Sequence, residues 1–236
     1  MLPRARRRVS IGHVAITQHP LVARRDMLKI FAEDRLVGVI RTATPELAER
    51  AARGLAEAGV RLVEITLTVP DAFELIAKLA NDSSFRDTGA VVGAGTVLSG
   101  AQAEESLLAG ARFLVSPALI PDMIKAGRAH DAMTMPGTLT ATEMVAAADA
   151  GADLIKVYPV ATVGGPAYIA NIRRALQLLP LVVTGNIGYD EIPEYLKAGV
   201  VGFGIGGPLI PAELLANGDH QALVANARRF LAATRA

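Results

Sequence analysis

Lys156 is the residue whose type and surroundings most clearly indicate chemistry. It lies in the apolar run "DLIKVYP" (153–159), whereas the other four lysines fall in segments with helical, solvent-facing spacing. An amine among apolar side chains loses hydration, which lowers its pKa and leaves it free to attack a carbonyl carbon. From burial alone, a strand-end lysine that reaches water or pairs with an acid explains the run equally well.

Glu64 is the candidate for the proton carrier that such chemistry needs. In "RLVEITL" (61–67) the alternation of a strand places Leu62, Glu64 and Thr66 on one face, which we expect to be the inner one. A lysine and a carboxylate that converge would supply a nucleophile and a proton shuttle, as imine formation requires. A structural ion pair between two strands is the alternative.

Groups that could bind an anion are further candidate residues. Arg41 follows the apolar run "LVGVI" (36–40), and its fork of N–H donors suits a carboxylate or a phosphate, although an exposed strand-end arginine needs no ligand. Glycines at the predicted strand-to-helix turns could hold phosphate through backbone N–H groups, and such glycines also occur for conformational reasons alone. They are Gly164, Gly165, Gly185, Gly206 and Gly207.

The segments that must position these residues are eight short apolar runs alternating with longer amphipathic runs. The predicted strands are residues 36–40, 60–67, 90–95, 112–116, 132–137, 153–159, 180–185 and 200–207. Thr44 before Pro45 indicates a helix start, and so does Thr140 three residues before Glu143, a capping box. Helix ends are predicted at the glycines of Ala-Gly pairs, namely Gly59, Gly110, Gly127, Gly151 and Gly199.

Eight such units without a linker predict one α/β domain, a single (β/α)8 TIM barrel over residues 20–236. A doubly wound open sheet is the alternative. Residues 20–33 are predicted to form an extra N-terminal helix at the barrel bottom. Residues 1–19 are predicted to be a basic, disordered extension, because residues 1–25 hold six arginines and no acid; a targeting peptide or a nucleic-acid arm is the alternative.

Catalytic groups of TIM barrels lie at the C-terminal ends of the strands. Arg41, Glu64 and Lys156 all fall there, and Thr66 and Thr184 are further candidates for substrate binding by the same position. These residues predict a polar, ionisable ring above an apolar barrel.

Composition excludes several classes of protein and site. The chain has no cysteine, which rules out disulfides and fits a reducing, cytoplasmic setting. No stretch approaches the roughly 18 uninterrupted apolar residues of a membrane span, so no membrane partner is expected. The four histidines are scattered, which predicts no metal site. No basic and aromatic residues interleave downstream, so no nucleic-acid partner is expected.

Seven segments resemble one known family, the 2-keto-3-deoxy-6-phosphogluconate (KDPG) aldolases and their phosphogalactonate and 4-hydroxy-2-oxoglutarate relatives. The similarity extends over about residues 28–232. The segments are "VEITLTVPDA" (63–72), "VVGAGTVL" (91–98), "FLVSP" (113–117), "MPGTLTATE" (135–143), "LIKVYP" (154–159), "VVTGNI" (182–187) and "GIGGPLI" (204–210).

The resemblance implies a class I aldolase, free of metal and cofactor, that cleaves KDPG to pyruvate and glyceraldehyde 3-phosphate. By its match to the family, Lys156 would form the Schiff base and Glu64 would move protons. Thr96 and Pro136 match positions that line the pyruvate end. The family also implies a homotrimer. An aldolase for a related 2-keto acid, an epimerase or a non-catalytic barrel scaffold are the alternatives, and an epimerase would need metal ligands that are absent.

Three positions depart from the common pattern of the family. Thr68 stands where some members have an arginine that binds the pyruvate carboxylate, and Arg41 fits the arrangement of members that carry the arginine after the first strand. Asn186 replaces the second glycine of the usual "TGG", and Gly207 replaces a serine that touches phosphate in many members. These differences bear on phosphate affinity and so on the natural substrate.

Overall fold

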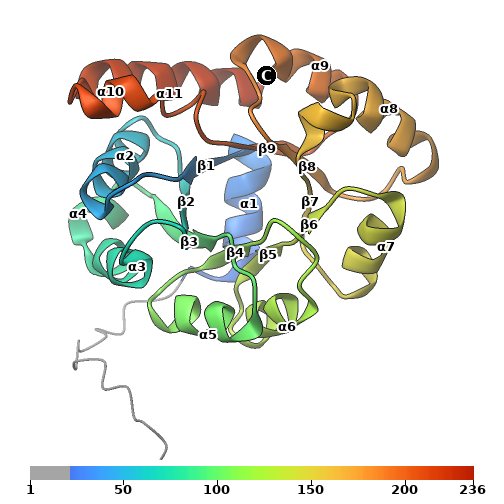
Figure 1. Cartoon of the computed structure of the whole chain (residues 1–236), viewed down its shortest axis with the longest axis horizontal. Helices are drawn as coiled ribbons and strands as arrows, with labels where there is room; N and C mark the ends of the chain where they lie inside the picture. Colours follow the sequence, from blue (N-terminus) through green and yellow to red (C-terminus); the bar gives the residue numbers. More distant parts are fainter. Residues whose placement is uncertain (1–21) are drawn as a thin grey trace, which may run out of the picture.

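The computed structural model of the chain describes residues 22–236, so the predicted extension of residues 1–19 lies outside the described part. Parallel strands alternate with helices around a central barrel, and Figure 1 looks into this barrel. The strands are β1 (Leu36–Ile40), β2 (Leu62–Thr66), β3 (Val91–Gly95), β4 (Phe113–Val115), β5 (Met133–Met135), β6 (Gly137–Thr138), β7 (Ile155–Val157), β8 (Leu181–Thr184) and β9 (Gly202–Ile205).

The strand order shows that the sheet closes. The strands pair in the order β5-β4-β3-β2-β1-β9-β8-β7-β6, and the two ends of this order are consecutive in the sequence. Only Pro136 separates β5 from β6. The predicted (β/α)8 barrel is therefore confirmed, and the alternative prediction, an open doubly wound sheet, is wrong.

Pro136 explains why the structure has nine strand segments where the sequence predicted eight. Because proline has no backbone N–H, it interrupts the predicted strand 132–137. The first half, β5, pairs with β4, and the second half, β6, pairs with β7. The carbonyl of Pro136 still accepts a hydrogen bond from the N–H of Lys156 at 3.0 Å, so the break keeps the barrel wall continuous.

Helices cover the outside of the barrel and begin where the sequence indicates. The Thr44 side chain caps the helix that starts at Pro45, and Thr140 and Glu143 form the predicted capping box. The helices are α1 (Arg24–Asp34), α2 (Pro45–Glu57), α3 (Ala72–Asn81), α4 (Ser83–Arg86), α5 (Gly100–Leu108), α6 (Pro121–Ala129), α7 (Ala141–Asp149), α8 (Gly165–Ala175), α9 (Ile192–Lys197), α10 (Ala212–Ala216) and α11 (His220–Arg235), with the 3-10 turns η1 (Val160–Val163) and η2 (Tyr189–Glu191).

Gly127 is the one predicted helix end that is wrong. The other four glycines of Ala-Gly pairs adopt positive φ just past a helix, whereas Gly127 lies inside α6 and is buried. A Cβ at this position would lie 2.2 Å from Cγ2 of Thr134, so the glycine allows α6 to approach β5 closely.

Helix α1 closes the bottom of the barrel, as predicted for residues 20–33. Its Met27 and Phe31 are buried in one cluster with Leu62, Phe113 and other inward residues of the strands. Val63 and Ile65 belong instead to the layer between strands and helices, which confirms the predicted inner and outer faces of β2. Figure 1 shows α1 through the centre of the barrel.

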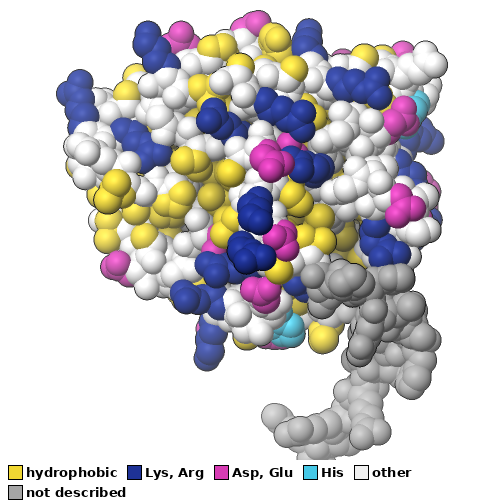
Figure 2. Space-filling view, turned by 180° about the vertical axis from the view of Figure 1, so that it is seen from behind, with side chains coloured by type: hydrophobic (Ala, Val, Ile, Leu, Met, Phe, Trp, Pro, Cys, Tyr) yellow, Lys and Arg dark blue, Asp and Glu magenta, His cyan; other side chains and the backbone are white. Residues whose placement is uncertain are grey.

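The face of the molecule behind the view of Figure 1 carries charges of both signs near its centre (Figure 2). On α1, Asp26 forms ion pairs with Arg25 and Lys29. Among residues 22–236, no helix has both the length and the apolar character needed to cross a bilayer.

Candidate active site

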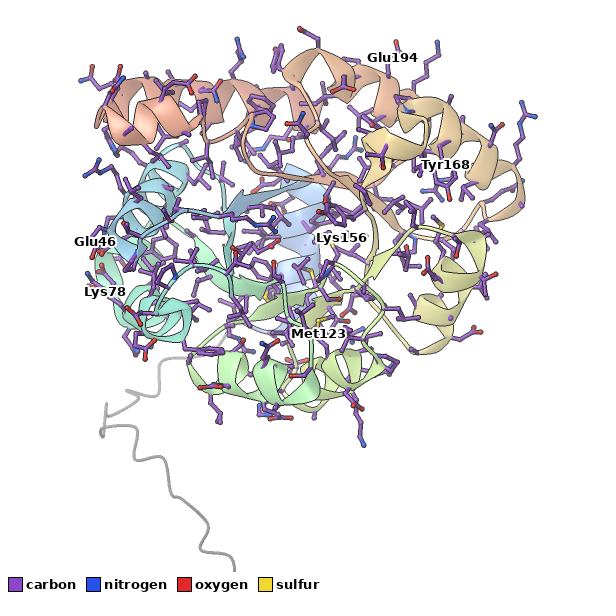
Figure 3. All side chains as sticks on the ribbon, in the orientation of Figure 1. Glu46, Lys78, Met123, Lys156, Tyr168 and Glu194 are labelled. Atoms are coloured by element: carbon purple, nitrogen blue, oxygen red, sulfur yellow. The ribbon has the colours of Figure 1, made fainter. Side chains whose placement is uncertain are left out.

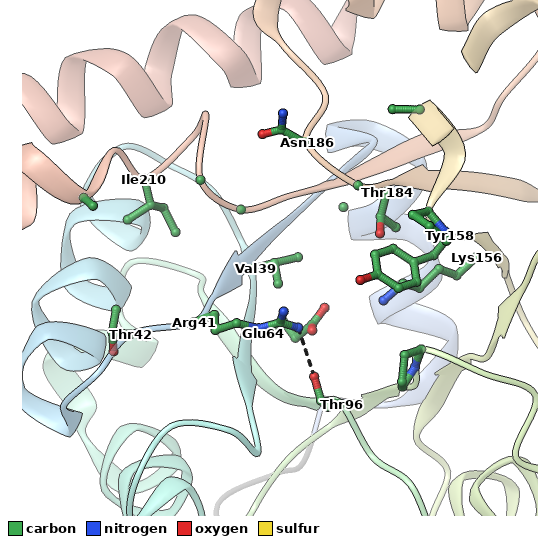
Figure 4. A pocket seen from close by; sticks show the side chains of 18 of the residues that line it. Val39, Arg41, Thr42, Glu64, Thr96, Lys156, Tyr158, Thr184, Asn186 and Ile210 are labelled. Atoms are coloured by element: carbon green, nitrogen blue, oxygen red, sulfur yellow. Dashed lines mark hydrogen bonds between the residues drawn. The ribbon is translucent and has the colours of Figure 1, made fainter. Parts of the chain in front are cut away.

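A cavity of about 810 Å³ opens at the C-terminal ends of the strands (Figure 4). Its wall includes eight of the twelve candidate residues predicted from the sequence. They are Arg41, Glu64, Thr96, Lys156, Thr184, Gly185, Gly206 and Gly207. The fold therefore brings together residues that are spread over about 170 positions of the chain.

Lys156 projects from β7 into the centre of the barrel, whereas Lys78 lies at the periphery (Figure 3). The residue is only 8% exposed. Its strand is held on both sides, because Lys156 pairs with Gly137 of β6 and with Val182 of β8. The backbone position of the amine is thus fixed by the barrel wall.

Glu64 enters the same cavity from β2 and is 1% exposed. Within the described part of the chain, its Oε2 is buried and has no hydrogen-bond partner. A buried polar atom without a partner costs free energy, and such atoms occur mainly where function requires them. The carboxyl group is therefore free to exchange protons with a bound molecule.

Burial sets the protonation of this pair. Loss of hydration lowers the pKa of Lys156 below its ordinary value of 10.5; the carboxylate of Glu64 opposes the shift and the charge of Arg41 adds to it. Loss of hydration also raises the pKa of Glu64 above 4.5, against the opposing charges of Lys156 and Arg41. Burial thus favours a free amine beside a protonated carboxyl group, which are the forms needed to attack a carbonyl carbon and to protonate its oxygen.

Arg41 and Thr96 form the wall across the cavity from Lys156 (Figure 4). Arg41 is exposed at the end of β1, and its Nη2 donates a hydrogen bond to Oγ1 of Thr96 at 3.4 Å. Thr96 has φ 57°, a left-handed conformation that is costly for a β-branched residue. The guanidinium group of Arg41 and the hydroxyl group of Thr96 line the same cavity as Lys156 and Glu64. A carboxylate on a substrate that is bonded to the amine would therefore meet them.

Four predicted residues do not belong to the lining of the cavity. The hydroxyl of Thr66 donates to the carbonyl of Ile40 at 2.9 Å, and Pro136 is buried in the barrel wall. Gly164 and Gly165 follow the turn η1 in the sequence and lie at the start of α8. Their roles in substrate or phosphate binding stay predictions.

Tyr158 and Asn186 line the cavity, although no role was predicted for either of them from the sequence. Tyr158 follows Lys156 by two positions, so the alternation of a strand would have placed it on the same face. Asn186 replaces a glycine of the usual pattern and keeps the positive φ that glycine adopts easily, at 55°. Among the described residues, no group of three or more acidic or histidine side chains could hold a metal ion.

A TIM barrel with a buried lysine and a buried glutamate at its C-terminal mouth has the groups of an enzyme that works through an imine. The chain belongs to the KDPG and KHG aldolase family, whose model matches residues 27–226.

Two relatives in this family are named for different substrates. A probable 2-dehydro-3-deoxy-6-phosphogalactonate aldolase of Rhizobium meliloti is 35% identical over 194 residues, 82% of this chain and 90% of that protein. A 2-dehydro-3-deoxy-phosphogluconate aldolase of Treponema pallidum is 32% identical over 208 residues, 87% of this chain and 97% of that protein.

A solved structure supports the same assignment. The KDPG aldolase of Legionella pneumophila, with pyruvate captured at low pH as a covalent carbinolamine intermediate, superimposes with a TM-score of 0.76 at 28% identity. The match covers 84% of this chain and 95% of that one.

Proposed function

We propose that this protein is a class I aldolase that cleaves KDPG into pyruvate and glyceraldehyde 3-phosphate through an imine on Lys156. The observation that carries the proposal is the buried pair in the cavity: an amine whose pKa is lowered by burial and a carboxyl group whose Oε2 has no hydrogen-bond partner among residues 22–236. The Legionella relative with its pyruvate carbinolamine supports the same chemistry.

The first half of the reaction forms the imine. The free amine of Lys156 attacks the keto carbon, and Glu64 gives a proton to the oxygen of the resulting carbinolamine, which leaves as water. Arg41 would hold the adjacent carboxylate with its fork of donors, and Thr96 fixes one of its nitrogens.

The second half breaks the bond between carbons 3 and 4. The protonated imine accepts the electron pair of this bond and becomes an enamine, while the ionised carboxylate of Glu64 takes the proton of the carbon 4 hydroxyl. The aldehyde leaves, Glu64 returns a proton to the enamine, and water releases pyruvate from Lys156.

Phosphate binding would rest on backbone groups. The cavity wall includes Gly185, Gly206 and Gly207, and its only described lysine and arginine are Lys156 and Arg41, which the imine and the carboxylate occupy. Backbone N–H groups at such turns bind phosphate without a cation. Thr184, buried at the end of β8, would contribute its hydroxyl.

One comparison suggests an alternative substrate. The Rhizobium relative, at 35% identity, is named for the phosphogalactonate substrate, which differs from KDPG in configuration. Pyruvate release from KDPG, its galactonate epimer and 4-hydroxy-2-oxoglutarate separates these substrates. We expect the highest kcat/KM with KDPG. A higher value with the epimer would reassign the substrate, and no release from any of the three would refute the aldolase.

Assembly and location are inferred from the family resemblance and composition. We infer a homotrimer in a cytoplasmic setting, with a small 2-keto acid as the partner of the site. The mass of the native protein in solution tests the trimer, and a monomer at working concentration would contradict it.

A further inference from the structure

Tyr158 is a residue of the cavity wall that no step above uses. It directly follows β7 and is half-buried, two positions beyond Lys156. The Nζ atom of Lys156 lies 5.0 Å from the centroid of the Tyr158 ring. Figure 4 shows the ring beside Lys156 with its hydroxyl directed into the cavity, toward the side that holds Glu64 and Arg41. The ring is therefore placed next to the reacting amine.

The hydroxyl of Tyr158 has no hydrogen-bond partner within the part of the chain that the structure describes, although the backbone N–H of this residue donates to Thr138 at 3.0 Å. By contrast, the hydroxyl of Tyr168, outside the cavity, donates to the carbonyl of Leu139. A phenol group in an apolar wall usually finds a partner, because its O–H is a good donor. A donor that faces only the cavity is available to a bound substrate.

The position of the ring selects which part of the substrate the hydroxyl can reach. Carbon 2 of a bound 2-keto acid is bonded to Nζ, and carbon 4 is two bonds further along the chain. Arg41 and Thr96 occupy the opposite wall, where the carboxylate at carbon 1 would lie. The Tyr158 ring stands at Lys156, away from that wall, and its hydroxyl points across the cavity toward the side that holds Glu64. Because Glu64 takes the proton of the oxygen on carbon 4, the hydroxyl points to where that oxygen must lie.

Resting on the proposed aldolase function, we propose that the Tyr158 hydroxyl donates a hydrogen bond to the oxygen on carbon 4 of the substrate. In cleavage, this oxygen gives its proton to Glu64 and becomes the aldehyde carbonyl, while the electron pair of the bond between carbons 3 and 4 moves into the enamine. Negative charge grows on the oxygen as its proton leaves. The phenol stabilises this charge and keeps its own proton.

The substitution Tyr158→Phe tests this role, because it keeps the ring beside Lys156 and removes only the hydroxyl. Two rates are measured: cleavage of the 2-keto-3-deoxy acid phosphate, and exchange of the methyl hydrogens of pyruvate in heavy water, followed by NMR. Exchange passes through the imine and the enamine but involves no oxygen on carbon 4. We expect cleavage to fall roughly 100-fold, as for the loss of one donor to a developing oxyanion, with exchange unchanged.

Two outcomes would overturn the assignment of Tyr158: undiminished cleavage, or an equal loss in both rates, which would mean that the residue acts on Lys156. A wild-type protein that neither cleaves nor exchanges would instead overturn the proposed function itself. Tyr189→Phe is the matched control, since Tyr189 packs edge-on against Phe230 outside the cavity lining. Both rates should stay at the wild-type level in this variant, and a matching loss there would also count against the assignment.

Discussion

Gly95 makes the space that the carboxyl group of Glu64 occupies. A Cβ added at Gly95 would lie 1.8 Å from Oε1 of Glu64. The two residues come from neighbouring strands, β2 and β3, whose register pairs Thr66 with Gly95. The absence of a side chain on one strand is therefore what allows the buried acid on the other.

We predict that Gly95→Ala reduces cleavage about 100-fold while the protein stays folded, because a shift of about 1 Å in a catalytic group costs that much. The displaced atoms, Oε1, Cδ and Cγ, all belong to the Glu64 side chain, which can rotate away, so the free energy of unfolding should fall by about 1–3 kcal/mol. Cleavage rates and urea unfolding measure the two effects. Gly188→Ala is the control, since its φ is −76° and its nearest neighbour 3.3 Å away. Wild-type activity in Gly95→Ala would show that the position of Glu64 is not critical.

The pH dependence of imine formation should respond to Arg41. The charge of Arg41 lowers the pKa of Lys156, so Arg41→Gln raises that pKa and leaves less free amine at a given pH below it. The acid limb of the rate of reductive trapping with pyruvate should therefore move to higher pH. Arg41→Lys keeps the charge but loses the fork of donors. The acid limb of the trapping rate should therefore stay at the wild-type pH in this variant, while KM rises about tenfold. An unmoved limb in Arg41→Gln would contradict this electrostatic role.

The strained backbone at Thr96 should lower the stability of the protein, while its side chain supports substrate binding through Arg41. A β-branched residue at φ 57° is strained, and asparagine adopts this conformation more easily. Thr96→Asn should raise the free energy of unfolding by about 1 kcal/mol and lower kcat/KM, because Arg41 loses its partner. Thr142→Asn, exposed on α7, serves as control and should change stability by less than about 0.5 kcal/mol. Lower stability in Thr96→Asn would argue against strain at this position.

Asp34 ties three elements together at the barrel bottom. Its side chain is fully buried and receives hydrogen bonds from Arg61, before β2, and from Arg235 at the end of α11. Burial alone would raise the pKa of Asp34, but the bonds from the two arginines outweigh it and lower the pKa below 3.8. The carboxylate therefore stabilises the fold above about pH 4, and this contribution is lost as the pH falls through the lowered pKa.

Asp34→Asn should consequently cost about 3 kcal/mol at pH 7, and the difference from wild type should shrink as the pH drops below 3.8. Urea unfolding at several pH values measures it. Glu33→Gln removes the exposed partner of the same arginine and should cost less than about 1 kcal/mol. A difference that is constant with pH would mean that the charge of Asp34 does not contribute.

Local patterns were enough to predict the barrel and the two central residues. The alternation in "RLVEITL" predicted that Glu64 points into the barrel, and Lys156 was singled out as the one lysine on a predicted strand. Both residues are buried in the structure. The misses depend on contacts between distant parts of the chain. Gly127 continues a helix, and its missing side chain leaves room for Thr134 of the neighbouring strand. The predicted strand 132–137 divides because its halves pair with different neighbours, β4 and β7. Tyr158 could have been predicted from the same alternation that located Glu64.

Covalent capture of pyruvate by Lys156 is the direct measurement of the proposed chemistry. The protein is incubated with pyruvate, reduced with borohydride, digested and examined by mass spectrometry, with Lys156→Met as the matched variant. We predict one pyruvate-derived adduct per chain, on the peptide that contains Lys156, and none in the variant. No adduct in the wild type, or an adduct on another lysine, would contradict the assignment of Lys156 as the nucleophile.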